Sequence, residues 1–197
     1  MRISLPDGNE LDLEDGATGL DAAAAIGPRL ARSAVAVDVG GEVRDLRLPL
    51  HDGEAIRVLT DRDPEALAVL RHSTAHVMAE AVTHLWPGVK VAIGPAIADG
   101  FYYDFARNEP FTPEDFAPIE AKMREIVARG ARFTREVVDR DDAIRLFQDK
   151  GEKYKAEIIQ DLPRGETITL YRQGDWVDLC RGPHMRSTAD VDRKSVV

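Results

Sequence analysis

The chain lacks the features of disulfide-bonded, secreted and membrane-spanning proteins. Cys180 is its only cysteine, so no disulfide can form within the chain and its stability must come from packing. No apolar run approaches the ~20 residues that span a bilayer, and the weakly polar stretch at residues 22–26 is too short for the core of a signal peptide. We therefore expect a cytoplasmic protein.

An excess of positive charge is also lacking. The formal net charge is -9, which argues against a protein that binds nucleic acid through a broad basic surface. Residues 1–149 carry 27 Asp and Glu against 17 Lys and Arg, whereas residues 150–197 carry eight against nine. Phosphate contacts are therefore expected in the last quarter of the chain, through single well-placed Lys or Arg side chains.

The first sixty residues alternate apolar and polar side chains between turns, which predicts a small β-rich unit. Residues 6–9 and Gly40-Gly41 are turns between strands, and Thr18 can cap a short helix that Gly27-Pro28 ends. The expected order is strand, strand, helix, strand, strand, strand, at residues 1–5, 10–13, 19–26, 35–39, 42–45 and 55–59. This is the order of a ubiquitin-like β-grasp. No cluster of catalytic residue types lies here, so we expect a binding or spacing module.

A polar boundary near residue 62 separates this unit from a second one, so domains are expected at residues 1–62 and 63–197. Asp63 can cap a helix that begins at Pro64, and Pro87-Gly88 should end it. The other expected elements are strands from residue 89 and at 101–105 and 132–137, helices at 113–128 and from 141, and short segments at 167–171 and 176–179. The mixture predicts an α+β fold rather than a repeat of βαβ units.

The helix expected from residue 64 contains two histidines, His72 and His76, in the sequence HSTAH. Residues four apart project from the same helix face about one turn apart. The zinc-protease pattern requires glutamate directly after the first histidine, and Ser73 occupies that position, so we reject that interpretation. The histidines are expected to line a cleft, because a different face carries the apolar stripe Leu67, Leu70, Met78, Ala81 and Leu85.

A second group of reactive side chains lies in the sequence DLCRGPH at residues 178–184. Cys180 and His184 are four residues apart in a segment with Gly and Pro, which predicts a tight loop. With His72 and His76 they offer three imidazoles and one thiol, which can build a tetrahedral zinc site. The same side chains can equally form a metal-free hydrolytic site with histidine as base.

The combination of HSTAH with DLCRGPH about a hundred residues later resembles the editing-domain superfamily shared by threonyl- and alanyl-tRNA synthetases. The three residues between Cys180 and His184, Arg181-Gly182-Pro183, are similar to those of the threonyl branch. So are the sequences at residues 94–95, 100–104 and 151–155. The β-rich unit resembles the TGS domain found at the start of threonyl-tRNA synthetases. The resemblance covers nearly the whole chain, to about Thr188.

The resemblance implies hydrolysis of mischarged seryl-tRNA for threonine to serine and free tRNA. It implies His72 as the leading base or water-positioning residue, with His76 and His184 shaping the water network or assisting the leaving group. The family's threonyl branch works without the zinc that the alanyl branch holds, so no cofactor is expected, although zinc at the four-residue set is not excluded by the sequence. Cys180 is not expected to be a covalent nucleophile, because water can attack an activated ester directly.

Three further residues complete the expected site. The resemblance implies that Asp178 accepts hydrogen bonds from the α-ammonium group of the substrate and that Lys155 supplies positive charge or relays a proton. Lys153 is the nearest competitor for that role. Tyr103 is expected to position the terminal adenosine or the water. Each has an ordinary alternative: a turn cap, a surface lysine or a strand aromatic.

The expected partner is tRNA. Full synthetases of this kind continue for several hundred residues into an aminoacylation core and an anticodon-binding domain, and neither is found in this chain, so no charging activity is expected. Binding should be weak and salt-sensitive, because little of the usual tRNA-contacting surface is present. The alternative interpretation is a non-catalytic fragment that binds tRNA or a protein partner.

Overall fold

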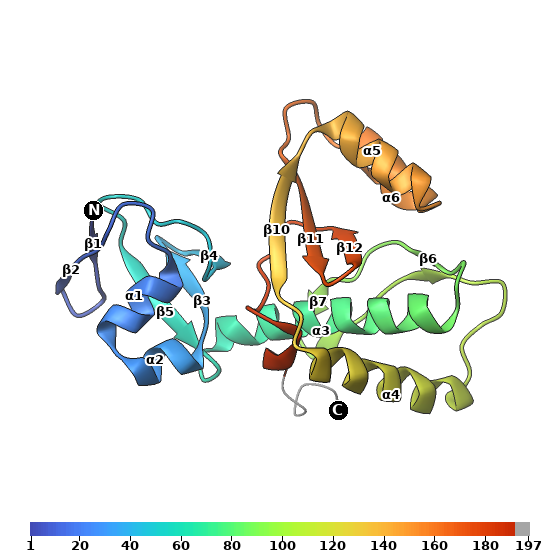
Figure 1. Cartoon of the computed structure of the whole chain (residues 1–197), viewed down its shortest axis with the longest axis horizontal. Coiled ribbons are helices and arrows are strands. Elements are labelled where there is room, and N and C mark those ends of the chain that lie inside the picture. The colour runs from blue at the N-terminus through green and yellow to red at the C-terminus, as the bar shows by residue number, and fades with distance from the viewer. Residues whose placement is uncertain (192–197) are drawn as a thin grey trace. The chain divides into compact units, whose positions relative to one another are not determined.

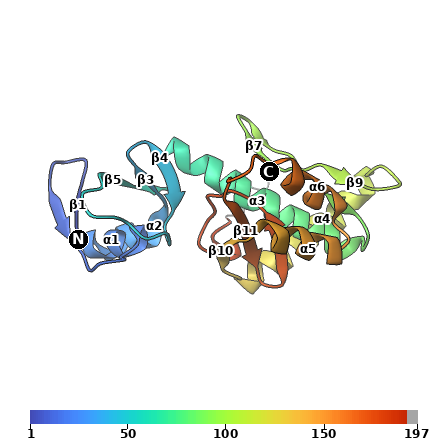
Figure 2. The ribbon, with the colours of Figure 1, turned by 90° about the horizontal axis from the view of Figure 1, so that it is seen from above.

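A computed structural model describes residues 1–191 and divides them into two compact units (Figures 1 and 2). The first unit consists of Met1–Arg71 together with Gly182–Arg186, and the second begins at His72, runs to Arg181 and resumes at Ser187. Among the described residues, no helix is both long enough and apolar enough to cross a membrane.

The first unit has the predicted order of strands, with one helix more than predicted. Its elements are β1 (Arg2–Ser4), β2 (Glu10–Asp12), α1 (Gly19–Ile26), α2 (Pro28–Ser33), β3 (Ala34–Val39), β4 (Glu42–Asp45) and β5 (Ile56–Thr60). Antiparallel pairing gives a sheet in the order β4-β3-β5, and β1 pairs with β2 as a hairpin. A parallel bridge from Ser4 to Ala55 joins β1 to the start of β5. This arrangement confirms the β-grasp, because its defining feature is a first strand parallel to the last.

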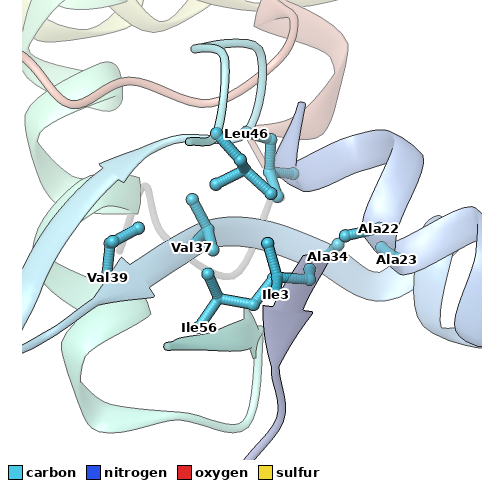
Figure 3. Packing of buried hydrophobic residues seen from close by; sticks show 9 residues of the cluster. Ile3, Ala22, Ala23, Ala34, Val37, Val39, Leu46 and Ile56 are labelled. Carbon is cyan, nitrogen blue, oxygen red and sulfur yellow. The ribbon is translucent and has the colours of Figure 1, made fainter. Parts of the chain in front are cut away.

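The core of the first unit forms where α1 covers the sheet. Figure 3 shows Val37 and Ile56 of the sheet, Ile3 of β1 and the alanines of α1 gathered in one cluster. Small residues permit this close approach: a Cβ on Gly19 would lie 3.0 Å from Val37. At the start of α1, the Thr18 side chain accepts from the Asp21 amide while Asp21 accepts from Thr18, which satisfies helix donors reciprocally.

One element of the first unit was not predicted. Gly27-Pro28 ends α1 as expected, but Pro28 also begins the second helix α2. Proline suits a first helical position because its missing N–H would have no partner there and its φ is already helical. The dipeptide therefore ends one helix and begins the next.

The second unit is an α+β structure, as predicted. Its elements are α3 (Pro64–Leu85, which begins in the first unit), β6 (Lys90–Val91), β7 (Ala96–Ile97), β8 (Gly100–Phe101), β9 (Phe105–Ala106), α4 (Pro113–Arg129), β10 (Phe133–Val138), α5 (Arg140–Asp149), α6 (Lys153–Asp161), β11 (Ile168–Gln173), β12 (Trp176–Leu179) and the 3₁₀ turn η1 (Thr188–Asp190). β10, β11 and β12 form an antiparallel sheet in chain order. The helices α5 and α6 pack on it around Phe147, Ile159 and Leu170.

Three details differ from the sequence predictions. The strand expected at residues 101–105 is split into β8 and β9, which pair with β7 and β6 respectively. Helix α6 was not predicted. The core stripe expected on α3 is confirmed only in part: Ala81 is buried, but Leu67 is 45% exposed, and His76 and Ala79 on the other face are buried as well. α3 is covered on several sides between residues 73 and 82, so no single apolar stripe describes it.

Candidate functional site

The predicted site residues come from four separate elements. His72 and His76 lie one turn apart on α3, Lys155 lies on α6, and Asp178 lies near the end of β12. Tyr103 lies between β8 and β9. Antiparallel pairing of β11 with β12 places Asp178 opposite Tyr171 and carries the chain on toward the predicted loop.

The histidines and the cysteine converge as predicted. The His72 and His76 rings lie edge to face with centroids 5.1 Å apart, and Cys180 Sγ is 3.2 Å from His72 Nε2. Within the second unit, one nitrogen or sulfur atom from each of His72, His76 and Cys180 lies within 4.8 Å of the others, whereas His184 belongs to the first unit. The His184 backbone N–H donates to Asp45 at 2.7 Å, which fixes its segment.

These four side chains suit zinc by type. A tetrahedral zinc site with N and S ligands would have ligand atoms about 3.3–3.6 Å apart, given Zn–N and Zn–S distances of about 2.0–2.3 Å. The atoms of His72, His76 and Cys180, which lie within 4.8 Å of one another, are somewhat farther apart than that. The side chains would therefore have to move closer together to bind an ion. The His72–Cys180 contact would then be replaced by coordination of both side chains to that ion.

Asp178 is the centre of a buried polar group beside the histidines. Its carboxylate lies 2.6 Å from Lys155 Nζ and accepts a hydrogen bond of 2.5 Å from the Tyr103 hydroxyl. Lys155 Nζ also donates to the Tyr103 hydroxyl oxygen at 3.3 Å. His76 Nε2 is 3.6 Å from the same carboxylate. Asp178 and Lys155 are 2% and 3% exposed, so this ion pair is shielded from water.

Burial controls the protonation of two of these groups. It lowers the pKa of His76 to about 3, against the opposing pull of Asp178, so the imidazole is neutral at pH 7. The pKa of Tyr103 lies well above its usual value, because burial and then the Asp178 carboxylate both disfavour the phenolate. Tyr103 is therefore a hydrogen-bond donor and His76 an uncharged ring under ordinary conditions.

Lys153 and Lys155 occupy different environments on α6. Lys155 points into the buried group, whereas Lys153 is exposed and lies 4.8 Å from the ring of Tyr154. The two lysines are separated by about 200° around the helix, since each residue advances ~100°. The geometry favours Lys155 as the site lysine, and the unpredicted helix is what separates the two.

A row of aromatic rings supports Tyr103. Phe105 stacks on Tyr103 with centroids 5.2 Å apart, Phe111 meets Phe105 edge to face, and Trp86 meets Phe111 in the same way. The Arg107 guanidinium lies over Trp86 and Phe111, at 4.6 and 4.9 Å from the ring centroids, and closes the row.

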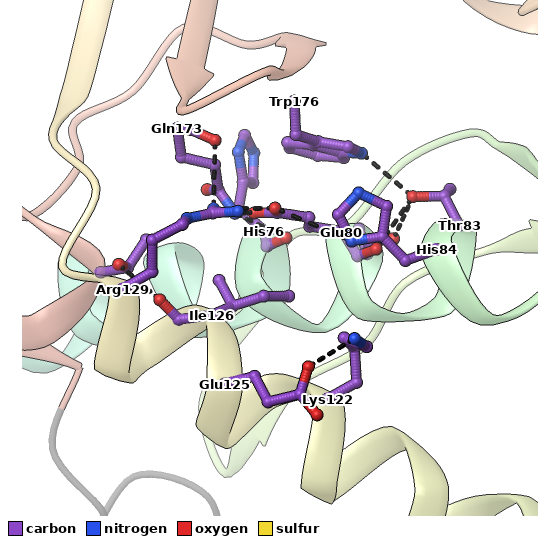
Figure 4. Close-up of polar contacts among 12 residues, drawn as sticks. His76, Glu80, Thr83, His84, Lys122, Glu125, Ile126, Arg129, Gln173 and Trp176 are labelled. Atoms are coloured by element: carbon purple, nitrogen blue, oxygen red, sulfur yellow. Dashed lines mark hydrogen bonds and ion pairs between the residues drawn. The ribbon is translucent and has the colours of Figure 1, made fainter.

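Sequence reasoning missed several residues that shape the site. Trp176 covers His76, with ring centroids 5.3 Å apart, and Glu80 is fully buried one turn after His76 (Figure 4). Gly94 lies directly against Tyr103, since a Cβ there would be 2.1 Å from the ring. A glutamate four residues after a site histidine was a signal available in the sequence.

Comparisons with known proteins agree with this arrangement. Residues 1–60 match the TGS domain, and residues 168–196 match the threonyl and alanyl tRNA synthetase second additional domain. The chain is 59% identical to a threonine–tRNA ligase from Acidiphilium cryptum and 61% identical to one from Granulibacter bethesdensis, each over 189 residues and 96% of this chain. Nearly the whole chain is therefore similar to a part of these threonine–tRNA ligases. The chain spans 30% and 29% of the length of these two relatives.

Proposed function

We propose that this part of a threonine–tRNA ligase hydrolyses the ester of seryl-tRNA for threonine, giving serine and free tRNA. The proposal rests on one observation: the buried Asp178 carboxylate, held by Lys155 and Tyr103, is 3.6 Å from His76, whose ring packs against His72. This arrangement provides an acceptor for an ammonium group next to a candidate base, as an aminoacyl ester requires.

The ligase activity named for the relatives gives a reason for such a site. Serine is threonine without one methyl group, and a binding pocket discriminates such a difference by only ~1–3 kcal/mol. A threonine-activating enzyme therefore attaches serine at an appreciable rate. A second, hydrolytic site that excludes the extra methyl group removes that product.

Substrate binding follows from the polar group around Asp178. Each carboxylate oxygen can accept more than one hydrogen bond, so Asp178 keeps capacity for the α-ammonium of serine beside Lys155 and Tyr103. The ammonium of Lys155 balances the buried negative charge of Asp178, and we assign it the further role of stabilising the developing oxyanion. The neutral Tyr103 hydroxyl fixes the orientation of the carboxylate.

The proton transfers belong to His72. A water molecule attacks the ester carbonyl carbon and gives a proton to the imidazole of His72. This addition forms a tetrahedral intermediate. The bond from carbon to the ribose oxygen then breaks, and that oxygen takes the proton from His72. His76 is a poor base, because its pKa is about 3. It therefore stays neutral and helps to position the water by hydrogen bonding.

This reaction needs neither a metal nor a covalent cysteine intermediate. The ester is already activated, and the histidine, lysine and carboxylate groups supply proton transfer and charge stabilisation. Zinc at the four-residue set is the alternative chemistry. Metal analysis of the purified protein distinguishes the two: stoichiometric zinc that is lost together with activity on chelation would contradict the metal-free proposal.

The decisive experiment compares release of serine from seryl-tRNA and of threonine from threonyl-tRNA, both on tRNA for threonine. We expect release of serine only, and His72→Ala should slow it about 10²–10⁴-fold, the usual contribution of general base catalysis. The matched control is His51→Ala, because His51 is an exposed histidine in a turn of the first unit.

Two results contradict the proposal. Serine release no faster than the spontaneous rate removes the hydrolase function and leaves the chain as a tRNA- or partner-binding fragment. A His72→Ala variant that is folded and fully active removes the role assigned to His72 while leaving the reaction itself in place.

A further inference from the structure

A buried polar network lies directly behind His76. Glu80 follows His76 by one turn of α3, and its side chain is 1% exposed. Arg129 Nη2, from the last turn of α4, lies 2.8 and 3.0 Å from the two oxygens of the Glu80 carboxylate. Gln173 Nε2, at the end of β11, donates to Glu80 at 2.6 Å and to the backbone carbonyl of His76 at 3.3 Å (Figure 4).

This network also holds the turn between β11 and β12. Arg129 Nη2 reaches the backbone carbonyl of Gln173 at 3.4 Å. Its guanidinium lies against the next residue, Gly174, where an added Cβ would be 3.3 Å from Cζ. Gly174 has a φ of 64°, the left-handed conformation that the turn requires and that glycine adopts freely. The Arg129 side chain of helix α4 therefore contacts both helix α3 and the hairpin turn.

A second contact holds the other strand of the hairpin. Trp176 pairs with Gln173 across the turn and donates from Nε1 to Thr83 Oγ1 at 3.2 Å. Its ring packs on the His76 imidazole. The hairpin is thus fixed to α3 at Glu80 and at Thr83, and β12 leads from Trp176 to Asp178 within two residues.

The chemistry of the network indicates positioning rather than stability. Glu80 is 1% exposed whereas Arg129 is 41% exposed. Moving the Glu80 carboxylate out of water is costly, and apolar residues of similar volume often stabilise a fold equally well. Both oxygens of the Glu80 carboxylate are hydrogen-bonded, and such a buried charged group holds its partners in a single geometry. The network selects that geometry where the hairpin delivers Trp176 and Asp178 to α3.

We propose that Glu80, Arg129 and Gln173 form a positioning clamp that fixes the β11–β12 hairpin on α3 and so sets where Trp176 and Asp178 meet His76. The clamp touches neither the substrate nor the reacting atoms. Its effect on catalysis rests on the proposed deacylase function, but its effect on the position of Trp176 does not.

The test compares Arg129→Met with Arg124→Met on the same helix. Arg124 makes an exposed ion pair with Glu120, so its replacement removes the same charge without touching the hairpin. Both changes are made in a Trp86→Phe background, because the chain has two tryptophans and Trp176 then reports alone. The measurements are acrylamide quenching of Trp176 and single-turnover serine release over a range of protein concentrations.

We expect Arg129→Met to increase quenching of Trp176 and to lower the saturating rate by about tenfold or more, since displacements of ~1 Å are costly in catalysis. The protein concentration for half-maximal rate should change little, and Arg124→Met should match its parent. Gln173→Leu, which keeps the Glu80–Arg129 pair, should give the same pattern and replaces Arg129→Met if that variant does not fold.

Unchanged Trp176 quenching in a folded clamp variant overturns the inference. So does a variant that is only less stable to heat, with the parent rate of release at low temperature. If the parent chain releases no serine, the proposed function fails, and the quenching comparison still decides whether the clamp exists.

Discussion

Gly94→Ala should damage the site through a single steric contact. The new Cβ would lie 2.1 Å from Tyr103 Cδ2, whereas carbon atoms prefer to be about 3.5–4.0 Å apart. The ring, or the strand beside it, must therefore move by about 1.5 Å. Gly94 is not one of the glycines with positive φ, so the effect comes from lost space and not from backbone strain.

The displacement acts on the contacts of the phenol. The Tyr103 hydroxyl is 2.5 Å from Asp178 and 3.3 Å from Lys155, and a movement of about 1.5 Å breaks both contacts. Overpacking costs about 1–3 kcal/mol of unfolding free energy. Misplacement of the carboxylate should also slow serine release by up to ~10²-fold.

A double-mutant cycle isolates this contact. Urea unfolding of Gly94→Ala should show the loss in unfolding free energy, and the same change should be nearly neutral in a Tyr103→Ala background, where the ring is absent. Gly27→Ala is the control, because a Cβ at Gly27 meets nothing within 4 Å. Equal losses in the two backgrounds would refute the steric explanation.

Two further predictions concern charge. Lys155→Met should destabilise the chain by about 3–5 kcal/mol in urea unfolding, since it leaves the Asp178 carboxylate buried without its cation, whereas Lys153→Met should be neutral; equal effects would contradict the assignment of the site lysine. The folded-state pKa of His76, about 3, lies below its ordinary value of 6.5. The stability that depends on neutral His76 is therefore complete above pH 6.5 and is lost as the pH falls toward 3, with a slope approaching about 1.4 kcal/mol per pH unit. A His76→Gln variant should lack this component, and an unchanged pH dependence of its unfolding free energy would show that His76 does not titrate in this range.

The first unit was predictable because its signals are local. Turn glycines, alternating valines and the cap at Thr18 each determine the structure of a few neighbouring residues, and together they give the β-grasp order. The second helix α2 escaped prediction because Pro28 was interpreted only as an end signal. Proline is compatible with a first helical turn as well as with a stop, and the sequence does not distinguish the two.

The second unit was less predictable because its elements depend on tertiary contacts. Helix α6 has no side-chain cap at its start and its helical pattern is short, so its residues lacked a strong local signal. The split of the strand at residues 101–105 follows from its two halves pairing with different partners, β6 and β7. Pairing partners are not encoded in alternation alone.

The convergence of the histidines with Cys180 was predicted from the resemblance of two motifs and not from spacing. What no motif indicated was the set of residues behind them. Glu80 and Gln173 are polar side chains at buried positions, and a single sequence contains no direct measure of burial. The roles of the site residues stay predictions until the variants described above are measured.

The row of rings from Trp86 to Tyr103 gives the site a stiff wall. Each ring is packed on the next and Arg107 closes the far end, so the phenol cannot step aside without moving the others. Under the proposed function, a group one methyl larger than serine would press against this row of packed rings. If the proposed function holds, such rigidity helps the site to leave the bulkier threonyl ester intact, because a compliant wall would admit both esters.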